Sequence, residues 1–271
     1  MVSFAGRICY NILGIVSCIH SGKRGFGEKG ILLLKILSCL ADILFPRRCV
    51  LCDAPLGFKT LHVCRKCRPK LKFIEEPWCL KCGKAMADAS KPYCRDCSRV
   101  NHYYTKGFAP FLYRGAMRES VVRFKYYGRG EYASFYAKAI LAFGKDRLEK
   151  WRIDAVVPVP VHRQRLYKRG YNQAALAAEA LSGLTGIPMD EKLVVRRVKT
   201  KAQKELDVSE RRRNLFEAFA LTKDSCPYER VLIVDDIYTS GSTVDAVARL
   251  LKEAGAAEVY FACICIGGED C

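Results

Sequence analysis

Two adjacent carboxylates, Asp235 and Asp236, stand shortly before a run of small and hydroxyl residues, a spacing that suits a sugar phosphate. The run is Thr239, Ser240, Gly241, Ser242 and Thr243. At a helix start, such a run offers hydroxyls, unpaired backbone N–H groups and the positive end of the helix dipole to a phosphate. The carboxylates can accept hydrogen bonds from vicinal hydroxyls, or coordinate a hard cation that bridges to a diphosphate. The stretch therefore predicts a site for a sugar phosphate, most naturally a ribose 5-phosphate.

The elements that must position this site are a buried strand over residues 231–234 and an amphipathic helix over residues 243–253. A Walker loop is excluded here, because the run lacks the Gly-Lys-Ser/Thr ending that holds the terminal phosphates of a nucleotide. The remaining alternative is an ordinary strand whose terminal acids cap the following helix.

A second loop, residues 160–173, is rich in guanidinium groups and follows a predicted strand over residues 155–159. In open α/β sheets the ligand binds beyond the carboxyl ends of the strands, so this loop is expected beside the first one. Arg163, Arg165 and Arg169 are the candidates for pairing with diphosphate oxygens.

Four Cys-x-x-Cys pairs at a regular spacing indicate metal sites. Their cysteines are Cys49, Cys52, Cys64, Cys67, Cys79, Cys82, Cys94 and Cys97. Two pairs complete one closed tetrahedral site, which predicts two structural Zn²⁺ ions. The simplest assignment joins the first pair to the second and the third to the fourth, and an interleaved arrangement is the alternative. Redox pairs and an iron–sulfur cluster are further alternatives, although redox pairs occur singly.

The net charge of +18 indicates a polyanion partner, since the excess of Lys and Arg is concentrated in the amino-terminal part of the chain. Basic residues between the cysteine pairs, with Trp78 and Tyr93 nearby, could bind single-stranded nucleic acid. Solvated lysines are the alternative. No stretch reaches the roughly 18 apolar residues of a membrane span, and the short apolar run over residues 8–19 lacks a clean cleavage site. We expect a cytoplasmic protein.

Composition and pattern divide the chain into four parts. Residues 1–28 are an appendage of unknown role, and residues 29–46 contain a helix that is apolar on most of its surface. This helix either packs on its own domain or attaches the protein to the inner face of the membrane. Residues 47–100 form the double zinc ribbon. Residues 107–271 alternate strands and helices, which predicts an α/β domain with a central parallel sheet.

In that last part, the pattern places strands over residues 108–113, 153–159, 193–198, 217–221, 231–234 and 258–266. Helices are expected over residues 116–127, 132–149, 171–184 and 243–253. Residues 200–214, which carry several Lys and Arg, are expected to form a mobile loop over the site.

The stretch 231–243 resembles the signature of the type I phosphoribosyltransferases, which bind phosphoribosyl pyrophosphate (PRPP). Residues 158–165, 169–173, 200–203 and 211–214, with Phe219, resemble the ComF family of competence proteins. In that family a zinc ribbon precedes a phosphoribosyltransferase-like domain, and the resemblance covers the chain from about Leu40 to its end. It implies the type I phosphoribosyltransferase fold, with a helix-flanked parallel sheet.

The family resemblance also implies a role in natural transformation, in which incoming single-stranded DNA passes toward the cytosol beside a helicase or membrane channel proteins. An active phosphoribosyltransferase with an unidentified acceptor is the alternative. In such an enzyme Asp235 and Asp236 would be catalytic, because they would hold the ribose as positive charge develops at its anomeric carbon. Mg²⁺ bound with PRPP and the three arginines would stabilise the departing diphosphate. The sequence leaves the acceptor and the oligomeric state open.

Overall fold

The computed structural model describes residues 46–57, 62–197 and 216–267, which belong to two compact units, residues 1–68 and residues 69–271. The expected appendage over residues 1–28, the apolar helix over residues 31–45 and the covering loop over residues 200–214 lie outside the described residues. Of the helices that the structure describes, none combines the length and the apolar character needed to cross a membrane.

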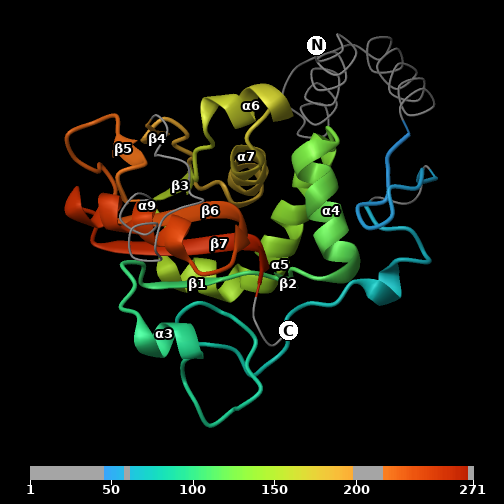
Figure 1. The fold of residues 1–271 in the computed structure, drawn as a ribbon, viewed down its shortest axis with the longest axis horizontal. Coiled ribbons are helices and arrows are strands. Elements are labelled where there is room, and N and C mark those ends of the chain that lie inside the picture. The colour runs from blue at the N-terminus through green and yellow to red at the C-terminus, as the bar shows by residue number, and fades with distance from the viewer. Residues whose placement is uncertain (1–45, 58–61, 198–215, 268–271) are drawn as a thin grey trace, which may run out of the picture. The chain divides into compact units, whose positions relative to one another are not determined.

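A parallel sheet forms the centre of the larger unit, with the strand order β1-β7-β6-β3 and with β2 pairing beside β1 on β7 (Figure 1). The strands are β1 (Lys106–Phe108), β2 (Phe111–Leu112), β3 (Ala155–Pro158), β6 (Arg230–Tyr238) and β7 (Glu258–Ile266). Both central strands, β6 and β7, are apolar along most of their length, because both faces of a parallel sheet are covered.

Helices cover the two faces of this sheet. α5 (Ala133–Trp151) packs on α7 (Gln173–Thr185) and on β7, while α9 (Ser242–Glu253) packs on β5, β6 and β7. Successive side chains of a strand point to opposite faces, and β7 shows this directly. The ring of Tyr260 stacks on Trp151 of α5 at 4.3 Å, and the next ring, Phe261, stacks on Tyr238 at 4.7 Å.

Shorter elements join these layers. α4 (Gly115–Tyr126) precedes α5, with a single 3₁₀ turn at Gly130–Tyr132 between them. α6 (Arg163–Arg169) follows β3, and α3 (Arg95–Arg99) precedes β1. In Figure 1, α6 and the strands β4 and β5 lie at one end of the larger unit, and α3 lies at the opposite end.

The expected α/β domain with a central parallel sheet is confirmed, and the structure corrects four details. The strand expected over residues 108–113 is two short strands, because Pro110 lacks the N–H that a continuous ladder needs. β4 (Val194–Arg196) and β5 (Phe219–Leu221) pair with each other in antiparallel fashion, outside the parallel sheet. β6 does not end before the carboxylates but continues to Tyr238.

The fourth detail concerns residues 160–173, where the prediction of an irregular loop was wrong, since this segment contains α6. The Nδ1 atom of His162 accepts a hydrogen bond from the backbone N–H of Gln164 at 3.2 Å and so caps the helix. Gly170 ends it in the left-handed conformation, with a φ of 81°. The sequence contained both signals.

Candidate functional site

Asp235 and Asp236 lie in the last part of β6 and are both partly buried. The two carboxylates are adjacent in the strand and have different partners. Asp236 pairs with α4, where its Oδ1 lies 2.8 Å from the Nζ of Lys125. The Oδ1 of Asp235 accepts a hydrogen bond of 2.8 Å from the backbone N–H of Asp236. The strand therefore offers two carboxylates with different surroundings.

The pKa of Asp235 is raised to about 7, first by burial and second by the neighbouring charge of Asp236. Lys125 and Arg196 oppose this rise with their positive charges. A bound cation would stabilise the ionised form of the carboxyl in the same way. A carboxyl so displaced from its ordinary pKa at the end of a sheet strand is typical of functional sites.

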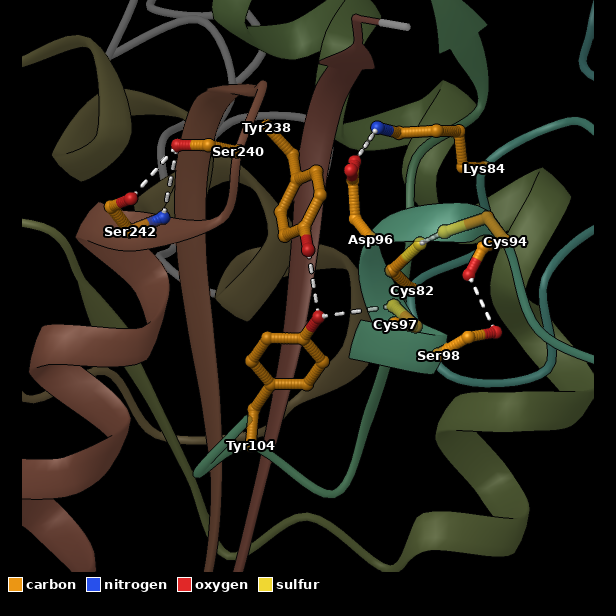
Figure 2. Close-up of polar contacts among 10 residues, drawn as sticks. All are labelled: Cys82, Lys84, Cys94, Asp96, Cys97, Ser98, Tyr104, Tyr238, Ser240 and Ser242. Carbon is orange, nitrogen blue, oxygen red and sulfur yellow. Dashed lines mark hydrogen bonds and ion pairs between the residues drawn. The ribbon is translucent and has the colours of Figure 1, made fainter. Parts of the chain in front are cut away.

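The phosphate loop, residues 239–243, connects β6 to α9. The hydroxyls of Ser240 and Ser242 lie 2.8 Å apart, as Figure 2 shows. Gly241 has a φ of 76°, and a Cβ atom at this position would come within 2.5 Å of the Tyr238 hydroxyl. Glycine is therefore required here on two grounds, backbone conformation and space. Gly241 precedes α9 and has no side chain to cap it, and the Ser242 N–H makes only a long contact of 3.5 Å with the Oγ of Ser240, so the first turn of the helix is available to an anion.

The three predicted diphosphate arginines all lie on α6, in different surroundings. Arg163 and Arg165 are exposed. Arg169 is partly buried and donates hydrogen bonds to the Oε1 of Gln173 at 2.8 Å and to the Tyr126 hydroxyl at 3.1 Å. Burial, and after it the charge of Arg165, lowers the pKa of Arg196, which also interacts with Asp235. Arg196 thus interacts electrostatically with both Arg165 and Asp235, while Arg169 is hydrogen-bonded to residues of α4 and α7.

Two further cations at this site, Lys125 and Arg196, could not be identified from the sequence motifs. Lys125 comes from α4 and Arg196 from β4, both far in sequence from the carboxylates that they influence. Neither lies in a pattern that predicts a ligand, and only the packing of α4 and the β4–β5 pair brings them to β6. Thr239 and Thr243 lie at the two ends of the phosphate loop, as predicted from their sequence positions.

The eight cysteines form two groups, each with its four sulfur atoms within 4.8 Å of one another. Cluster one, in the smaller unit, is Cys49, Cys52, Cys64 and Cys67; cluster two, in the larger unit, is Cys79, Cys82, Cys94 and Cys97. The grouping is the sequential one, and the interleaved alternative is wrong for this structure.

Distances between the sulfur atoms test whether these groups fit zinc. The Sγ atoms of Cys52 and Cys64 are 3.8 Å apart, and those of Cys82 and Cys94 are 3.7 Å apart. Sulfur atoms at about 2.3 Å from one tetrahedral Zn²⁺ lie roughly 3.8 Å from one another, whereas a disulfide requires about 2.05 Å. Both groups therefore fit structural zinc with four thiolate ligands.

The two clusters also repeat one backbone turn. The N–H of Asp53 donates to the carbonyl of Cys49 at 2.8 Å, and the N–H of Gly83 donates to the carbonyl of Cys79 at 2.9 Å. Both turn residues have a positive φ, 59° for Asp53 and 76° for Gly83. Each turn brings the two thiols of its pair together, as expected for a zinc knuckle.

Family comparisons agree with these observations. Residues 40–98 match the double zinc ribbon domain, and residues 169–270 match the phosphoribosyl transferase domain. The chain is 41% identical over 108 residues to competence protein F of Haemophilus influenzae, covering 39% of this chain and 47% of that protein. It is 39% identical over 114 residues to the DNA utilization protein YhgH of Escherichia coli K12, covering 41% of this chain and 49% of that protein.

A third relative is competence protein ComFC of Streptococcus pneumoniae, 32% identical over 152 residues, which cover 56% of this chain and 64% of that protein. The chain thus spans about half the length of the first curated relatives that it matches. These matches bear out the resemblance to the ComF competence proteins: the chain carries a double zinc ribbon domain followed by a phosphoribosyltransferase domain of the type I fold.

Proposed function

We propose that this chain acts in DNA uptake during natural transformation, as a protein that binds PRPP at the phosphate loop and single-stranded DNA on an adjacent face. The names of the relatives support the first part of this proposal, since two are competence proteins and one is a DNA utilization protein. In this role the protein would work in the cytoplasm, at the inner face of the membrane, beside a helicase or a channel protein.

The DNA role rests on three exposed tyrosines at the end of α4 and on α6, which we together call the tyrosine face. Its members are Tyr126, Tyr127 and Tyr167, exposed by 63%, 67% and 87%. Large rings so exposed indicate an interaction surface. Single-stranded nucleic acids stack their bases on such rings, and each stacked base contributes about 1–3 kcal/mol.

Cations accompany the tyrosine face and connect it to the phosphate site. The guanidinium of Arg169 lies over the Tyr126 ring, 4.8 Å from its centroid. Exposed Arg163, Arg165 and Lys168 on α6 add positive charge that can contact phosphates. Lys125, which pairs with Asp236, directly precedes Tyr126 in the chain. A strand bound here would therefore pass close to the carboxylates.

The zinc ribbon is a weaker candidate for DNA binding, because carboxylates already pair with some of its cations. Lys84 lies 2.7 Å from Asp96, and Lys91 lies 3.2 Å from Asp88. Each such pair reduces the local positive charge. The tyrosine face is therefore the better-supported surface.

Binding of a fluorescent single-stranded oligonucleotide, measured between about 50 and 200 mM salt, tests the DNA role. Affinity should fall steeply with salt, because each phosphate contact releases counterions. Tyr126→Ala with Tyr167→Ala should weaken binding about tenfold or more, in line with the loss of one or two stacked bases. Tyr93→Ala is the matched control, because Tyr93 is an exposed tyrosine of the ribbon (45%) and should change affinity little. Equal losses in both variants, or no binding at low salt, would refute the assignment.

Binding of PRPP with Mg²⁺ is supported by the same arrangement of residues that favoured a sugar phosphate in the sequence. Asp235 and Asp236 offer carboxylates for the ribose hydroxyls or for Mg²⁺, and the phosphate loop receives the 5-phosphate. Arg163, Arg165 and Arg169 remain the predicted partners of the diphosphate. Calorimetry should detect binding that disappears in Asp235→Asn with Asp236→Asn. Unaltered affinity in that double variant would mean that the ligand binds elsewhere.

The second candidate function is catalysis, the transfer of ribosyl phosphate from PRPP to an unidentified acceptor. It is favoured by the two adjacent carboxylates at the end of β6, one of which, Asp236, is held in place by its ion pair with Lys125. As the bond to the diphosphate breaks, positive charge develops on the sugar, and the two carboxylates would stabilise it. Release of diphosphate from PRPP in the presence of candidate bases distinguishes this function from binding alone.

A further inference from the structure

The segment that leaves cluster two on its way to β1 contacts the residues that flank the phosphate loop, Tyr238 before it and Asp245 after it. Within this segment, residues 102–104, Tyr104 is fully buried, and its hydroxyl lies 2.7 Å from the hydroxyl of Tyr238 (Figure 2). The same Tyr104 hydroxyl lies 3.9 Å from the Sγ of Cys97, a member of cluster two. Tyr238 ends β6 and directly precedes Thr239. A continuous chain of contacts therefore runs from the cysteine cluster to the first residue of the loop.

The same segment also contacts the first turn of α9, which follows the phosphate loop. The backbone N–H of Tyr103 donates to the Oδ1 of Asp245 at 2.7 Å, and the Nδ1 of His102 lies 3.4 Å from that oxygen. Asp245 is only 1% exposed and belongs to the first turn of α9, two residues after Thr243. Residues 102–104 thus contact both β6 and α9, the two elements that the phosphate loop connects.

Aromatic packing makes this connection rigid. The rings of Tyr238 and Phe261 stack at 4.7 Å with an angle of 2°, and Tyr104 meets Phe261 edge to face at 4.8 Å. Gly241, in the middle of the phosphate loop, lies directly against the Tyr238 hydroxyl, as the 2.5 Å approach of a Cβ there indicates. Any shift of Tyr238 would therefore move the loop.

We propose that cluster two, through Tyr104 and Asp245, holds the phosphate loop in the conformation that binds the anion. Tyr104, Tyr238 and Asp245 are then positioning residues, and zinc in cluster two is a condition for tight binding at the loop. The physical reason is that a loop already ordered loses less conformational entropy when the ligand binds. Cluster one belongs to the other compact unit and has no part in this role. The inference rests on the phosphate site proposed above.

Two pairs of cysteine variants separate the clusters. Cys94→Ser with Cys97→Ser removes ligands of cluster two, and Cys52→Ser with Cys64→Ser does the same for cluster one. Metal analysis should give about one Zn²⁺ per chain for each variant, since each retains one closed site. PRPP affinity, measured by calorimetry with Mg²⁺, should fall only in the cluster two variant. Backbone amides of residues 239–245 should exchange hydrogen faster only in that variant, with no ligand added.

Tyr104→Phe tests the connection with all zinc ligands in place, so it remains informative if the cysteine variant fails to fold. It removes the hydroxyl that bonds to Tyr238 and keeps the ring. PRPP affinity should fall about two- to tenfold, the range expected for one hydrogen bond. The matched control is Tyr136→Phe, because Tyr136 is equally buried and its hydroxyl lies 2.6 Å from that of Ser120. Tyr136 belongs to α5, on the opposite face of the sheet, so its loss should leave the affinity unchanged.

The outcomes separate this inference from the proposed function. Unchanged affinity and unchanged exchange in Tyr104→Phe would overturn the inference while leaving PRPP binding established. If the unaltered protein does not bind PRPP, the proposed function fails, and the exchange rates of residues 239–245 still decide whether cluster two orders the loop. A loss of affinity in Tyr136→Phe equal to that in Tyr104→Phe would show a general loss of stability instead of a positioning role.

Discussion

Replacing Asp235 by Asn should make the protein more stable at pH 8 and at the same time weaken its binding of PRPP. The structure gives the reason, because Asp235 is partly buried next to a second carboxylate, and these surroundings raise its pKa to about 7. An ionised carboxylate at this position costs folding free energy that a neutral amide does not. A site kept charged for binding at the expense of stability is a common compromise in functional sites.

The sign and size of the effect follow from the two pKa values. Between the ordinary pKa of 3.8 and the folded pKa of about 7, the folded protein retains a proton that the unfolded chain has released. Stability is therefore full below about pH 4, falls as the pH rises, and is lowest above about pH 7. Each pKa unit is equivalent to about 1.36 kcal/mol, which gives an upper limit of about 4 kcal/mol. Because solvent reaches part of the Asp235 side chain, we expect about 2 kcal/mol.

Thermal unfolding of the unaltered protein and of Asp235→Asn, at pH 5 and at pH 8, measures this effect. For a domain of this size, about 2 kcal/mol corresponds to a rise in Tm of roughly 4–8 °C at pH 8, with a smaller difference at pH 5.

Asp154→Asn is the control of opposite sign. Burial opposes ionisation of Asp154, but hydrogen bonds from Arg230 outweigh it and lower its pKa. That variant should lose stability at pH 8, and the loss should shrink as the pH falls below the ordinary pKa of 3.8 and vanish below the lowered pKa of folded Asp154. A Tm of Asp235→Asn that is unchanged or lower at pH 8 would refute the reasoning.

Three further predictions concern the metal, the phosphate loop and the cation beside it. Metal analysis should find two Zn²⁺ per chain, and removing them with a chelator should lower the Tm; one ion or none would contradict the two-site structure. Gly241→Ala should cost about 1–3 kcal/mol in denaturant unfolding, since its φ of 76° and its contact with Tyr238 both disfavour a Cβ; a stability equal to that of the unaltered protein would contradict this. Lys125→Met should cost about 1–2 kcal/mol at pH 8, because Asp236 loses its partner at 2.8 Å, and should raise the pKa of Asp235 further. An unchanged stability would mean that solvent screens the pair.

Local sequence patterns predicted much of the fold. They did not predict one short helix and one strand pairing. Four apolar residues before two acids predicted β6, and the alternation of strands and helices predicted the parallel sheet. The helix α6 was not predicted, although His162 and Gly170 signal its ends, because its seven residues are too few to show a helical apolar period. The antiparallel pairing of β4 with β5 could not be predicted, since strand partners depend on contacts distant in sequence.

The sequence by itself determined the chemistry of this protein, because ligand type depends on residue types at close spacing. Eight cysteines in four pairs predict zinc sites, and two acids before a glycine-containing hydroxyl loop predict a sugar-phosphate site. Only the tertiary structure decided which groups act together. It placed Lys125 and Arg196 beside the carboxylates, and it joined cluster two to the phosphate loop through Tyr104 and Tyr238. These contacts link residues up to 134 positions apart, and no local pattern encodes them because they arise only when the helices and strands pack.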